Sequence, residues 1–439
     1  LVLIHKSEKG MSDEELRSGL ADFIKECLNE ISVKRASSGN EGENEIKVLI
    51  LPPDFTRMYS GAGHITALLT AIFSNITEKS GLKVNIDVMP ALGTHVPMSE
   101  EECRVFFEGA VDFNNLIVHN WRTDVVKIGE VPAEFVSEVS EGLVNEKIVV
   151  EVNRRLVSGE YDLILSVGQV VPHEVVGMAN YSKDIFVGCG GSSMINSSHM
   201  LGAFYGMERI MGRDFSPVRR VFDYAEQNFI ADLPLKYILT VTTNTGDDVH
   251  IHGIYCGRER SNFEEAVAQS SQVNFIKLDK PLKKCVVNLD AREFKSTWLG
   301  NKAIYRSRLA MADGGDLIIL APGVVQFGED SENDRLIRKY GYVGRENVLK
   351  LVSENRDLKE NLSVAAHLIH GSSDDRFRIT YCTKKLSEAE IQSVNFGYCS
   401  YEEVSEKYNP EKLHDGWNRG ADGEEFYYIS NPALGLWSV

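Results

Sequence analysis

The stretch Val48-Leu-Ile-Leu-Pro-Pro-Asp-Phe-Thr-Arg57 joins a continuous apolar run to a polar turn. A short apolar run of this kind is typical of a strand buried on both faces of a parallel sheet. An amphipathic segment follows, in which Ile65, Leu69 and Phe73 recur at helical spacing before Gly81 offers a residue that can end a helix. Alternating apolar residues then predict a second strand. Because strand–helix–strand crossovers are almost always right-handed, this order predicts a parallel βαβ unit.

The same order of elements recurs toward the C-terminus. Cys285-Val-Val-Asn-Leu289 predicts a strand, residues 302–312 predict a helix, and Asp316-Leu-Ile-Ile-Leu320 predicts another strand. Alternation of strands and helices is the pattern of an α/β protein whose parallel sheets are flanked by helices. We therefore predict this fold class for both parts of the chain.

The chain has 439 residues, and at roughly 100–200 residues per domain this length predicts about two or three domains. The polar stretch Asp279–Lys284 separates the two groups of elements. We place the predicted boundary there. The predicted N-terminal α/β domain covers residues 1–280 and carries the candidate cofactor and acid–base residues. The C-terminal α/β domain covers residues 281–439, and its tail from about residue 401 can pack back on the N-terminal domain.

Charge and composition exclude several functional classes. The chain carries 47 Lys+Arg against 64 Asp+Glu, a net charge of −17, whereas nucleic-acid binding needs a clustered basic surface. No apolar run approaches the ~20 residues that span a bilayer, and Leu1-Val-Leu-Ile4 is too short for a signal-peptide core. The seven cysteines include no Cys-x-x-Cys pair. We expect no nucleic-acid partner, no membrane association and a reducing, cytoplasmic location.

Polar residues follow the first predicted strand, namely Asp54, Thr56 and Arg57. Ligands of open parallel sheets bind beyond the carboxyl ends of the strands, and the free N–H groups of a following helix favour an anion. Arginine adds a planar, permanently charged donor group. A surface ion pair between Asp54 and Arg57 is the alternative interpretation. No Walker or Gly-x-Gly-x-x-Gly pattern indicates a standard nucleotide site.

Histidine and lysine residues gather after the later strands. His95 lies between a predicted strand and the capping box Ser99–Glu102. His173, Lys183 and His199 follow another strand with the spacing His-x9-Lys-x15-His. Histidine exchanges protons near neutral pH, desolvated lysine is a nucleophile, and imidazole ligates transition metals. Base, nucleophile and ligand types therefore converge here, although a polar connecting loop is the alternative.

Two further histidine pairs keep open a different metal chemistry. His250 and His252 alternate in a strand-like run, which places both side chains on one face at a spacing that suits metal ligation. His367 and His370 have the spacing of neighbours on a helix but no obvious third partner. An exposed strand face is the commoner origin of the first pattern. A metal-dependent lyase or hydrolase is therefore an alternative function.

The candidate residues together resemble the nickel-dependent lactate racemase family. The resemblance rests on motifs in a characteristic order and is weaker around Trp298–Lys302, so that it covers about residues 47–325. It implies two α/β domains with the active site in the cleft between them. It also implies an isomerase that inverts C2 of a 2-hydroxy acid. The motifs are Asp54-Phe-Thr-Arg57, Gly93-Thr-His95, Pro172-His173, Lys183 and His199.

The cofactor that this resemblance implies is a nickel pincer nucleotide. It is a pyridinium-3-thioamide-5-thiocarboxylate mononucleotide whose sulfur and carbon atoms grip nickel. By the resemblance, Lys183 would be its covalent tether and His199 would ligate nickel. Asp54, Thr56 and Arg57 would hold the cofactor near the end of the first strand. Cofactor-biosynthesis proteins would then be partners of this chain.

The resemblance also assigns the residues that act on the substrate. His95 and His173 would be the catalytic acid–base residues on opposite faces of a 2-hydroxy acid. Lys302 and Arg57 would bind its carboxylate. Removal of the C2 hydrogen as hydride, while one histidine takes the hydroxyl proton, would give a planar keto acid. Return of hydride to the other face would complete the inversion, with the second histidine supplying the proton.

The sequence departs from the family pattern near the expected substrate. Met178-Ala-Asn-Tyr-Ser182 stands where the family often has a glycine-rich run, and Leu299 stands near a usual glutamine. These differences predict a substrate other than lactate, and the polar segment His414–Arg419 suits a larger sugar acid, an aldonate. A non-catalytic homologue that binds a sugar acid or a nucleotide is the remaining alternative.

Overall fold

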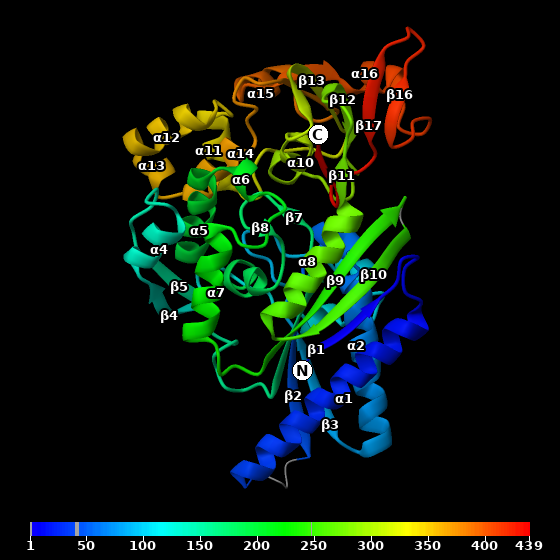
Figure 1. The fold of residues 1–439 in the computed structure, drawn as a ribbon, viewed down its shortest axis with the longest axis vertical. Helices are drawn as coiled ribbons and strands as arrows, with labels where there is room; N and C mark the ends of the chain where they lie inside the picture. Colours follow the sequence, from blue (N-terminus) through cyan, green and yellow to red (C-terminus); the bar gives the residue numbers. More distant parts are fainter. Residues whose placement is uncertain (1, 40–43, 247) are drawn as a thin grey trace. The chain divides into compact units, whose positions relative to one another are not determined.

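The computed structural model describes residues 2–39, 44–246 and 248–439 (Figure 1). The chain divides into two compact units with interleaved segments. The expected domains, residues 1–280 and 281–439, remain a prediction, as does the docking of the tail. Unit 1 comprises Leu1–Val171, Met178–Ile195 and Arg219–Val273, and unit 2 comprises Pro172–Gly177, Asn196–Val218 and Asn274–Val439.

Unit 1 is built on a six-stranded sheet with the order β1-β10-β9-β6-β2-β3. The strands from β9 to β3 are parallel to one another, and β10 and β1 extend the sheet as antiparallel strands. The predicted βαβ unit is confirmed, and Gly81 ends its helix with φ 73°. The strands are β1 (Val2–Lys6), β2 (Glu45–Leu51), β3 (Lys83–Val88), β6 (Leu163–Gln169), β9 (Leu235–Thr245) and β10 (Asp248–Gly257), beside the antiparallel pair β4 (Val125–Val131) and β5 (Ile148–Asn153).

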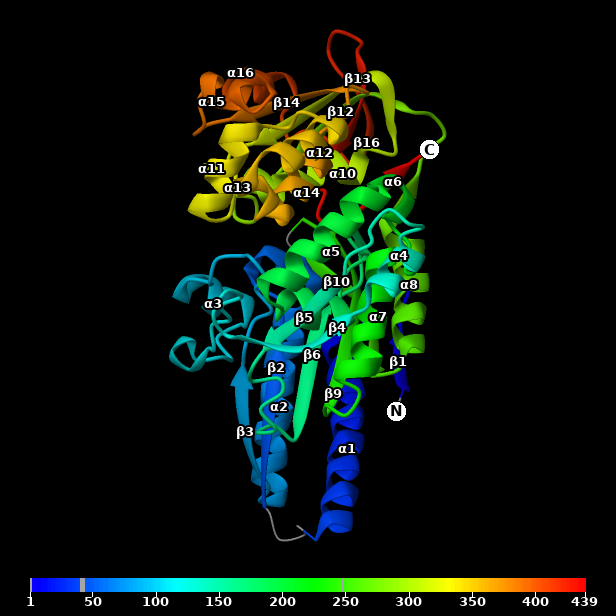
Figure 2. The same ribbon diagram turned by 90° about the vertical axis from the view of Figure 1, so that its left-hand side faces the viewer.

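Helices cover both faces of this sheet (Figures 1 and 2). Apolar residues of α1 and α2 form one core with Val48 and Ile50 of β2, and the first helix begins at a capping box between Ser12 and Glu15. On the other face, Tyr181 stacks on Phe263 of α8. The helices are α1 (Asp13–Ser38), α2 (Ala62–Ser80), α3 (Glu100–Phe106), α4 (Ala133–Val139), α7 (Pro217–Phe229) and α8 (Arg260–Asn274), with short helices at Phe55–Ser60, Phe113–Asn115 and Asp184–Gly188.

Unit 2 carries a second six-stranded sheet, with the order β15-β14-β13-β12-β17-β16, that is parallel apart from its edge strand β16. The α/β class predicted from sequence is therefore confirmed. The strands are β12 (Leu282–Asn288), β13 (Met311–Ala321), β14 (Arg378–Thr383), β15 (Gly397–Ser400), β16 (Gly416–Arg419) and β17 (Glu425–Ile429), beside the small pair β11 (Phe275–Lys277) and β18 (Leu436–Ser438). The short pair β7 (Pro172–His173) and β8 (Gly177–Met178) comes much earlier in the chain.

Helices accompany the unit 2 sheet, and one of them is shorter than predicted. The helix expected over residues 302–312 ends at Ser307, because Met311 already pairs with Leu282 in the sheet. Among the described helices, not one combines the length and apolar composition that a bilayer span requires. The helices are α5 (Ser192–Tyr205, which begins in unit 1), α6 (Met207–Ile210), α9 (Thr297–Gly300), α10 (Lys302–Ser307), α11 (Ser331–Tyr340), α12 (Arg345–Glu354), α13 (Arg356–Lys359), α14 (Leu362–His370), α15 (Glu388–Ser393) and α16 (Tyr401–Lys407).

Candidate active site

The turn after β2 holds a buried aspartate against a histidine. Oδ1 of Asp54 accepts a hydrogen bond from the Thr56 backbone N–H at 2.8 Å and so caps the short helix that follows. Its other oxygen, Oδ2, lies 2.7 Å from Nδ1 of His95. Asp54 is 3% exposed, whereas His95 is half-buried. The loops after β2 and β3, which are neighbours in the sheet, thus build an aspartate–histidine dyad.

Electrostatics fix the protonation of this dyad. Burial disfavours the carboxylate, but the adjacent His95 and Thr56 favour it more, so that the pKa of Asp54 falls to about 2. The ionised carboxylate then accepts the Nδ1–H of His95. In a neutral imidazole this leaves the lone pair on Nε2. His95 can therefore accept a proton at Nε2, and Asp54 stabilises the imidazolium that results.

The segment that carries Lys183 packs against the loop of His95. Lys183 immediately precedes a one-turn π-helix, Asp184–Gly188, a form that is frequent at functional sites. The Gly93 backbone N–H donates a hydrogen bond to the carbonyl oxygen of Gly188 at 2.8 Å. The candidate acid–base residue and the candidate tether therefore come from two loops of unit 1 that touch each other.

Two cations predicted to bind the cofactor share a buried acidic neighbour. Asp184 is 8% exposed, and its carboxylate accepts a hydrogen bond from Asn180 Nδ2 at 2.6 Å. Burial raises the pKa of Asp184 to about 6, and Lys183 and Arg57 act against this rise. Because Arg57 and Lys183 both interact electrostatically with the Asp184 carboxylate, we treat them as one cationic group. An anionic cofactor group could bind there.

A buried arginine shapes the chain just before Lys183. Arg219 is 0% exposed and donates hydrogen bonds to Ser182 Oγ at 2.8 Å, to the Met178 carbonyl at 2.7 Å and to the Asn180 carbonyl at 3.0 Å. Asn180 has φ 65°, a left-handed conformation that needs such support. Arg219 is therefore a positioning residue for the candidate tether.

The second candidate base, His173, has different surroundings in unit 2. Its Nδ1 accepts a hydrogen bond from the Val175 backbone N–H at 3.1 Å. An imidazole that accepts at Nδ1 carries its neutral-state proton on Nε2. Glu174 Oε2 lies 3.5 Å from the same Nδ1, where it would attract a second proton on the ring. In this state His173 presents an N–H donor, not a base, at Nε2.

His199, the predicted nickel ligand, is half-buried on α5 in unit 2. The Ser363 backbone N–H donates to Asn196 Oδ1 at 3.0 Å and fixes α5 against α14. Burial lowers the pKa of His367 and His370 on α14 to about 3, and His199 acts in the same direction on both. The imidazole of His199 therefore has two neutral imidazoles in its electrostatic surroundings.

Lys302, the residue of unit 2 that is predicted to bind the substrate carboxylate, is buried. Lys302 Nζ lies 2.9 Å from Glu293 Oε1, and the two side chains are 6% and 1% exposed. Trp298 stacks on His367 with ring centroids 4.3 Å apart, and Leu299 lies in the core. The structure thus places Lys302 in a buried ion pair. Its contact with a substrate remains a prediction.

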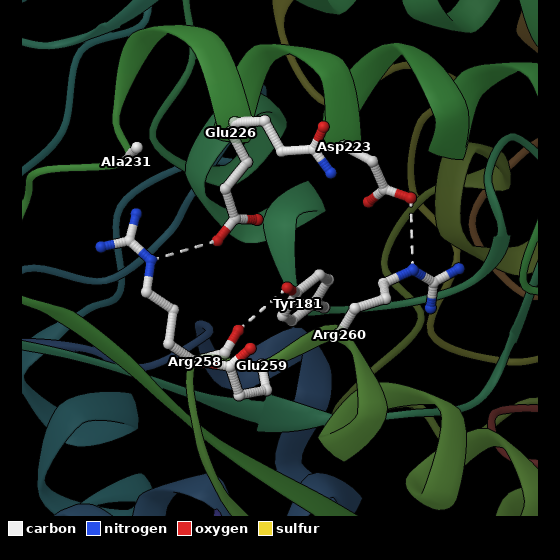
Figure 3. A pocket seen from close by; sticks show the side chains of 8 residues that line it. Tyr181, Asp223, Glu226, Ala231, Arg258, Glu259 and Arg260 are labelled. Atoms are coloured by element: carbon white, nitrogen blue, oxygen red, sulfur yellow. Dashed lines mark hydrogen bonds and ion pairs between the residues drawn. The ribbon is translucent and has the colours of Figure 1, made fainter. Parts of the chain in front are cut away.

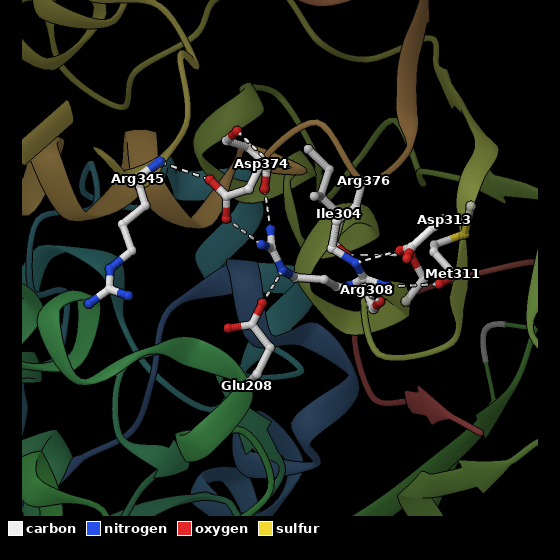
Figure 4. Close-up of polar contacts among 10 residues, drawn as sticks. Glu208, Ile304, Arg308, Met311, Asp313, Arg345, Asp374 and Arg376 are labelled. Atoms are coloured by element: carbon white, nitrogen blue, oxygen red, sulfur yellow. Dashed lines mark hydrogen bonds and ion pairs between the residues drawn. The ribbon is translucent and has the colours of Figure 1, made fainter. Parts of the chain in front are cut away.

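A second buried arginine, Arg308, lies among polar contacts of unit 2 (Figure 4). Arg308 is 4% exposed, donates to Glu208 and to the Ser372 carbonyl, and has Nη2 2.6 Å from Asp374 Oδ2. Glu208 belongs to α6, which directly follows α5, and Ser372 follows α14. Arg308 therefore connects the segment that follows α5, which carries His199, to the segment that follows α14, which carries His367 and His370.

The other predicted metal pair has no third ligand. β10 has an irregular register at His252, whose Nε2 lies 2.7 Å from Thr243 Oγ1 and whose Nδ1 lies 3.2 Å from the Ser7 carbonyl. Within residues 2–39, 44–246 and 248–439, no group of three or more His, Cys, Asp or Glu side chains is arranged to hold a metal ion. The structure therefore gives His250 and His252 no support as the centre of a metal-dependent lyase or hydrolase.

Comparison with known proteins identifies the N-terminal part of the chain. Residues 13–210 match the family model of the lactate racemase N-terminal domain. These residues belong to the lactate racemase family. The lactate racemase N-terminal domain contains most of the predicted site residues but not Lys302, which lies beyond the match. The predicted family is thereby confirmed.

Solved structures show the same fold over nearly the whole chain. A protein from Thermotoga maritima is 23% identical with a TM-score of 0.81, and the similarity covers 99% of each chain. The lactate racemase apoprotein from Thermoanaerobacterium thermosaccharolyticum is 16% identical with a TM-score of 0.64, over 95% of this chain and 93% of that chain. No curated protein matches in sequence. At these identities the structures establish the fold.

Sequence analysis missed two buried residues, Asp184 and Arg219, that contact the residues of the candidate site or the segment before Lys183. Asp184 follows Lys183 directly, and its position beside a candidate nucleophile was an available signal. Arg219 lies on an amphipathic helix whose charged residues look like a solvated face, so no local pattern reveals that it is fully buried. Such buried polar contacts depend on tertiary packing and not on spacing along the chain.

Proposed function

We propose that the chain is a racemase or epimerase that inverts C2 of a 2-hydroxy acid with a lysine-tethered nickel pincer nucleotide. The observation that carries this proposal is the 2.7 Å contact between the buried Asp54 carboxylate and Nδ1 of His95, within a lactate racemase N-terminal domain. Inversion at an alcohol carbon requires that the hydroxyl proton be removed and later returned. The dyad supplies a base with its lone pair fixed on Nε2.

The proposed roles of the two histidines differ at the start of a turnover. His95 would take the hydroxyl proton at Nε2, and Asp54 would stabilise the charge. His173 would return a proton to the substrate oxygen from the other face. A neutral ring that gives up its only proton becomes an imidazolate, so His173 must first be protonated on both nitrogens. Glu174, 3.5 Å from Nδ1, would hold the second proton.

The residues present fit the proposed cofactor. Lys183 offers an amine beside Arg57, which would hold an anionic group, and Asp54 and Thr56 lie at the same strand end. His199 offers a half-buried imidazole, a ligand type that nickel accepts. When bound, the nickel pincer nucleotide would supply a reversible hydride acceptor. Other proteins of the cytoplasm would have to make it.

The proposed substrate is a sugar acid rather than lactate. The support is the sequence departure at Met178–Ser182 and at Leu299, together with the polar strand β16 and its preceding turn, His414–Arg419. Lys302 and Arg57 are the proposed partners of the substrate carboxylate. The Arg57 guanidinium is permanently charged, and the Lys302 ammonium group is also a cationic N–H donor. For Lys302 this requires that its ammonium group contact the substrate carboxylate as well as Glu293.

The experiment that tests the proposal starts with protein from a host that makes the cofactor. We expect an intact mass above that of the polypeptide and bound nickel, both lost in Lys183→Ala. Lys147→Ala is the matched control, because the Lys147 side chain is 61% exposed and forms an ion pair with the Glu130 carboxylate, far from the candidate tether in sequence. Chiral chromatography of lactate and a set of aldonates then detects inversion at C2.

The outcomes separate the proposal from its alternatives. A bare polypeptide mass from such a host contradicts the tether at Lys183. Full loading without C2 hydrogen exchange in any 2-hydroxy acid favours a non-catalytic binding protein. Inversion of lactate but of no aldonate contradicts the proposed substrate class and leaves the reaction type intact.

A further inference from the structure

A pocket of about 300 Å³ lies in unit 1 between α7 and the beginning of α8 (Figure 3). Arg258, which lines it, donates to the carbonyls of Ile230 and Leu233, just before β9 begins. β9, β6 and β2 are parallel, so this pocket lies at the amino ends of the strands. Asp54 follows the carboxyl end of β2. The pocket is therefore distinct from the candidate active site.

The two arginines that line the pocket are already engaged in holding its walls. Arg258 donates through Nη1 and Nη2 to two backbone carbonyls at 2.5 Å each. Arg260 donates through Nε to Asp223 Oδ2 at 3.2 Å. Figure 3 shows both guanidinium groups at the sides of the pocket, that of Arg258 next to the Glu226 carboxylate and that of Arg260 next to the Asp223 carboxylate. An anionic ligand would have to break these contacts, which makes an anion a poor match for the pocket.

The buried carboxylate of Glu226 is held only loosely by its neighbours, Arg258 and the Tyr237 hydroxyl. Glu226 is 7% exposed, and its Oε1 lies 3.7 Å from Arg258 Nε, beyond hydrogen-bond distance. No described residue forms a hydrogen bond of standard geometry with Oε2. Burial raises the pKa of Glu226 to about 7, even though Arg258 and the Tyr237 hydroxyl favour the ionised form. A cationic N–H donor in the pocket would recover the lost solvation of this carboxylate.

Other groups at the pocket also accept hydrogen bonds. The Tyr181 hydroxyl donates its proton to the Arg258 carbonyl at 3.0 Å and keeps its lone pairs for a ligand. Glu259 adds an exposed carboxylate to the lining. We propose that this pocket binds a small organic cation with N–H donors, an alkylammonium ion, and that Glu226 is its anchor. A metal ion fits less well, since no described cluster of three or more suitable side chains is arranged for one.

Binding of a ligand at this pocket would affect the backbone next to Lys183. Tyr181 lies two residues before Lys183, and Arg219, which holds Ser182, interacts electrostatically with Asp223 and Tyr181. An occupied pocket should therefore protect the backbone amides of residues 178–183 from hydrogen exchange. This readout needs neither cofactor nor activity, so that it stands apart from the proposed function.

The test uses the full chain and 1,4-diaminobutane as the probe, with the neutral isostere 1,4-butanediol as the ligand control. Titration calorimetry should show saturable binding of the diamine and none of the diol. Glu226→Gln keeps the size of the side chain and should weaken diamine binding at least tenfold. Glu138→Gln, at a carboxylate that is 67% exposed on α4, should leave it unchanged.

The pH dependence provides a second measurement that does not rely on a variant. The charged and titratable groups that face Glu226 include Arg258, Asp223 and Arg219, together with the hydroxyls of Tyr237 and Tyr181. With a pKa of about 7, Glu226 loses most of its charge between pH 8 and pH 6, and diamine affinity should fall about tenfold. The absence of saturable diamine binding, full binding by Glu226→Gln or equal binding of the diol would each overturn the proposal.

Discussion

The surroundings of His95 in unit 1 differ from those of His173 in unit 2. His95 Nδ1 faces a carboxylate that is 3% exposed and ionised, at 2.7 Å. His173 Nδ1 faces a backbone N–H donor at 3.1 Å and, at 3.5 Å, the partly exposed Glu174. One ring is therefore held as a base at Nε2 and the other as a donor. The two candidate acid–base residues therefore favour opposite neutral tautomers.

In the proposed reaction, this difference lets His95 accept the hydroxyl proton directly, whereas His173 must first gain a proton on Nδ1. A substrate hydroxyl needs an acceptor on one face, and the planar keto acid needs a donor on the other. The buried aspartate fixes one state strongly, whereas a backbone N–H and a nearby glutamate allow the other ring to change state. His173 is thus the more adaptable partner in the proposed reaction.

The largest effect should come from replacing the rings themselves. The equilibrium constant between the two C2 epimers does not depend on the enzyme, so His95→Asn and His173→Asn must each lower kcat/KM by the same factor in both directions, by about 10²–10⁴-fold. Single-turnover formation of the 2-keto acid should separate them. Each variant should still oxidise one enantiomer at a rate near that of the loaded wild type. Chemical trapping of the keto acid measures this rate.

The matched control for these variants is His64→Asn, a histidine that pairs with the surface residues Asp13 and Glu108. Equal loss of keto acid from both enantiomers in both variants would contradict the assignment of one histidine to each face. Intact mass should show the same cofactor loading in all three variants, since neither catalytic candidate is the proposed tether.

The fold was predictable where local and tertiary preferences agree. The capping box at Ser12, the stop at Gly81 and the apolar run Val48–Leu51 each specify an element without help from distant residues. The helix predicted over residues 302–312 failed at its end because strand pairing of Met311 outweighs helical preference. Pairing with a distant strand leaves no local signal.

The candidate site was predictable as a set of residue types but not as a set of environments. Motif order in the sequence pointed to Asp54, His95 and Lys183, and the structure brings their loops together. The direction of the Asp54 pKa could not be predicted, because burial and His95 act in opposite directions and only geometry decides between them. The role of Arg219 could not be predicted either, because only tertiary packing shows that this side chain is buried.

A matched pair of carboxylate variants sharpens the comparison further. Asp54→Asn removes the buried charge that holds the Nδ1–H of His95, and we expect kcat to fall about 10²-fold or more. Glu174→Gln removes a partly exposed partner of His173 and should cost less than about fivefold, because its 3.5 Å contact is weaker than the 2.7 Å contact between Asp54 and His95. Steady-state kinetics on loaded enzyme measure both. Similar losses in the two variants would contradict the inferred asymmetry.

The smallest effect is on stability, and it should reverse sign between two buried aspartates of unit 1. The folded pKa of Asp54 is about 2, below its ordinary 3.8, so its contribution is complete above about pH 4 and is lost as pH falls through 2. Asp54→Asn should therefore destabilise the protein at pH 7, by on the order of 2 kcal/mol, and progressively less toward pH 2.

Asp184 should respond in the opposite direction. Burial raises its folded pKa to about 6, so its contribution is complete below about pH 4 and is lost as pH rises through 6. Asp184→Asn should therefore raise the urea midpoint relative to wild type at pH 7 and lose this advantage at pH 4. Circular dichroism during urea unfolding at both pH values measures each variant. A decrease at pH 7 for both variants would show that Asp184 is held as firmly as Asp54, and that the dyad with His95 is not exceptional among the buried charges of unit 1.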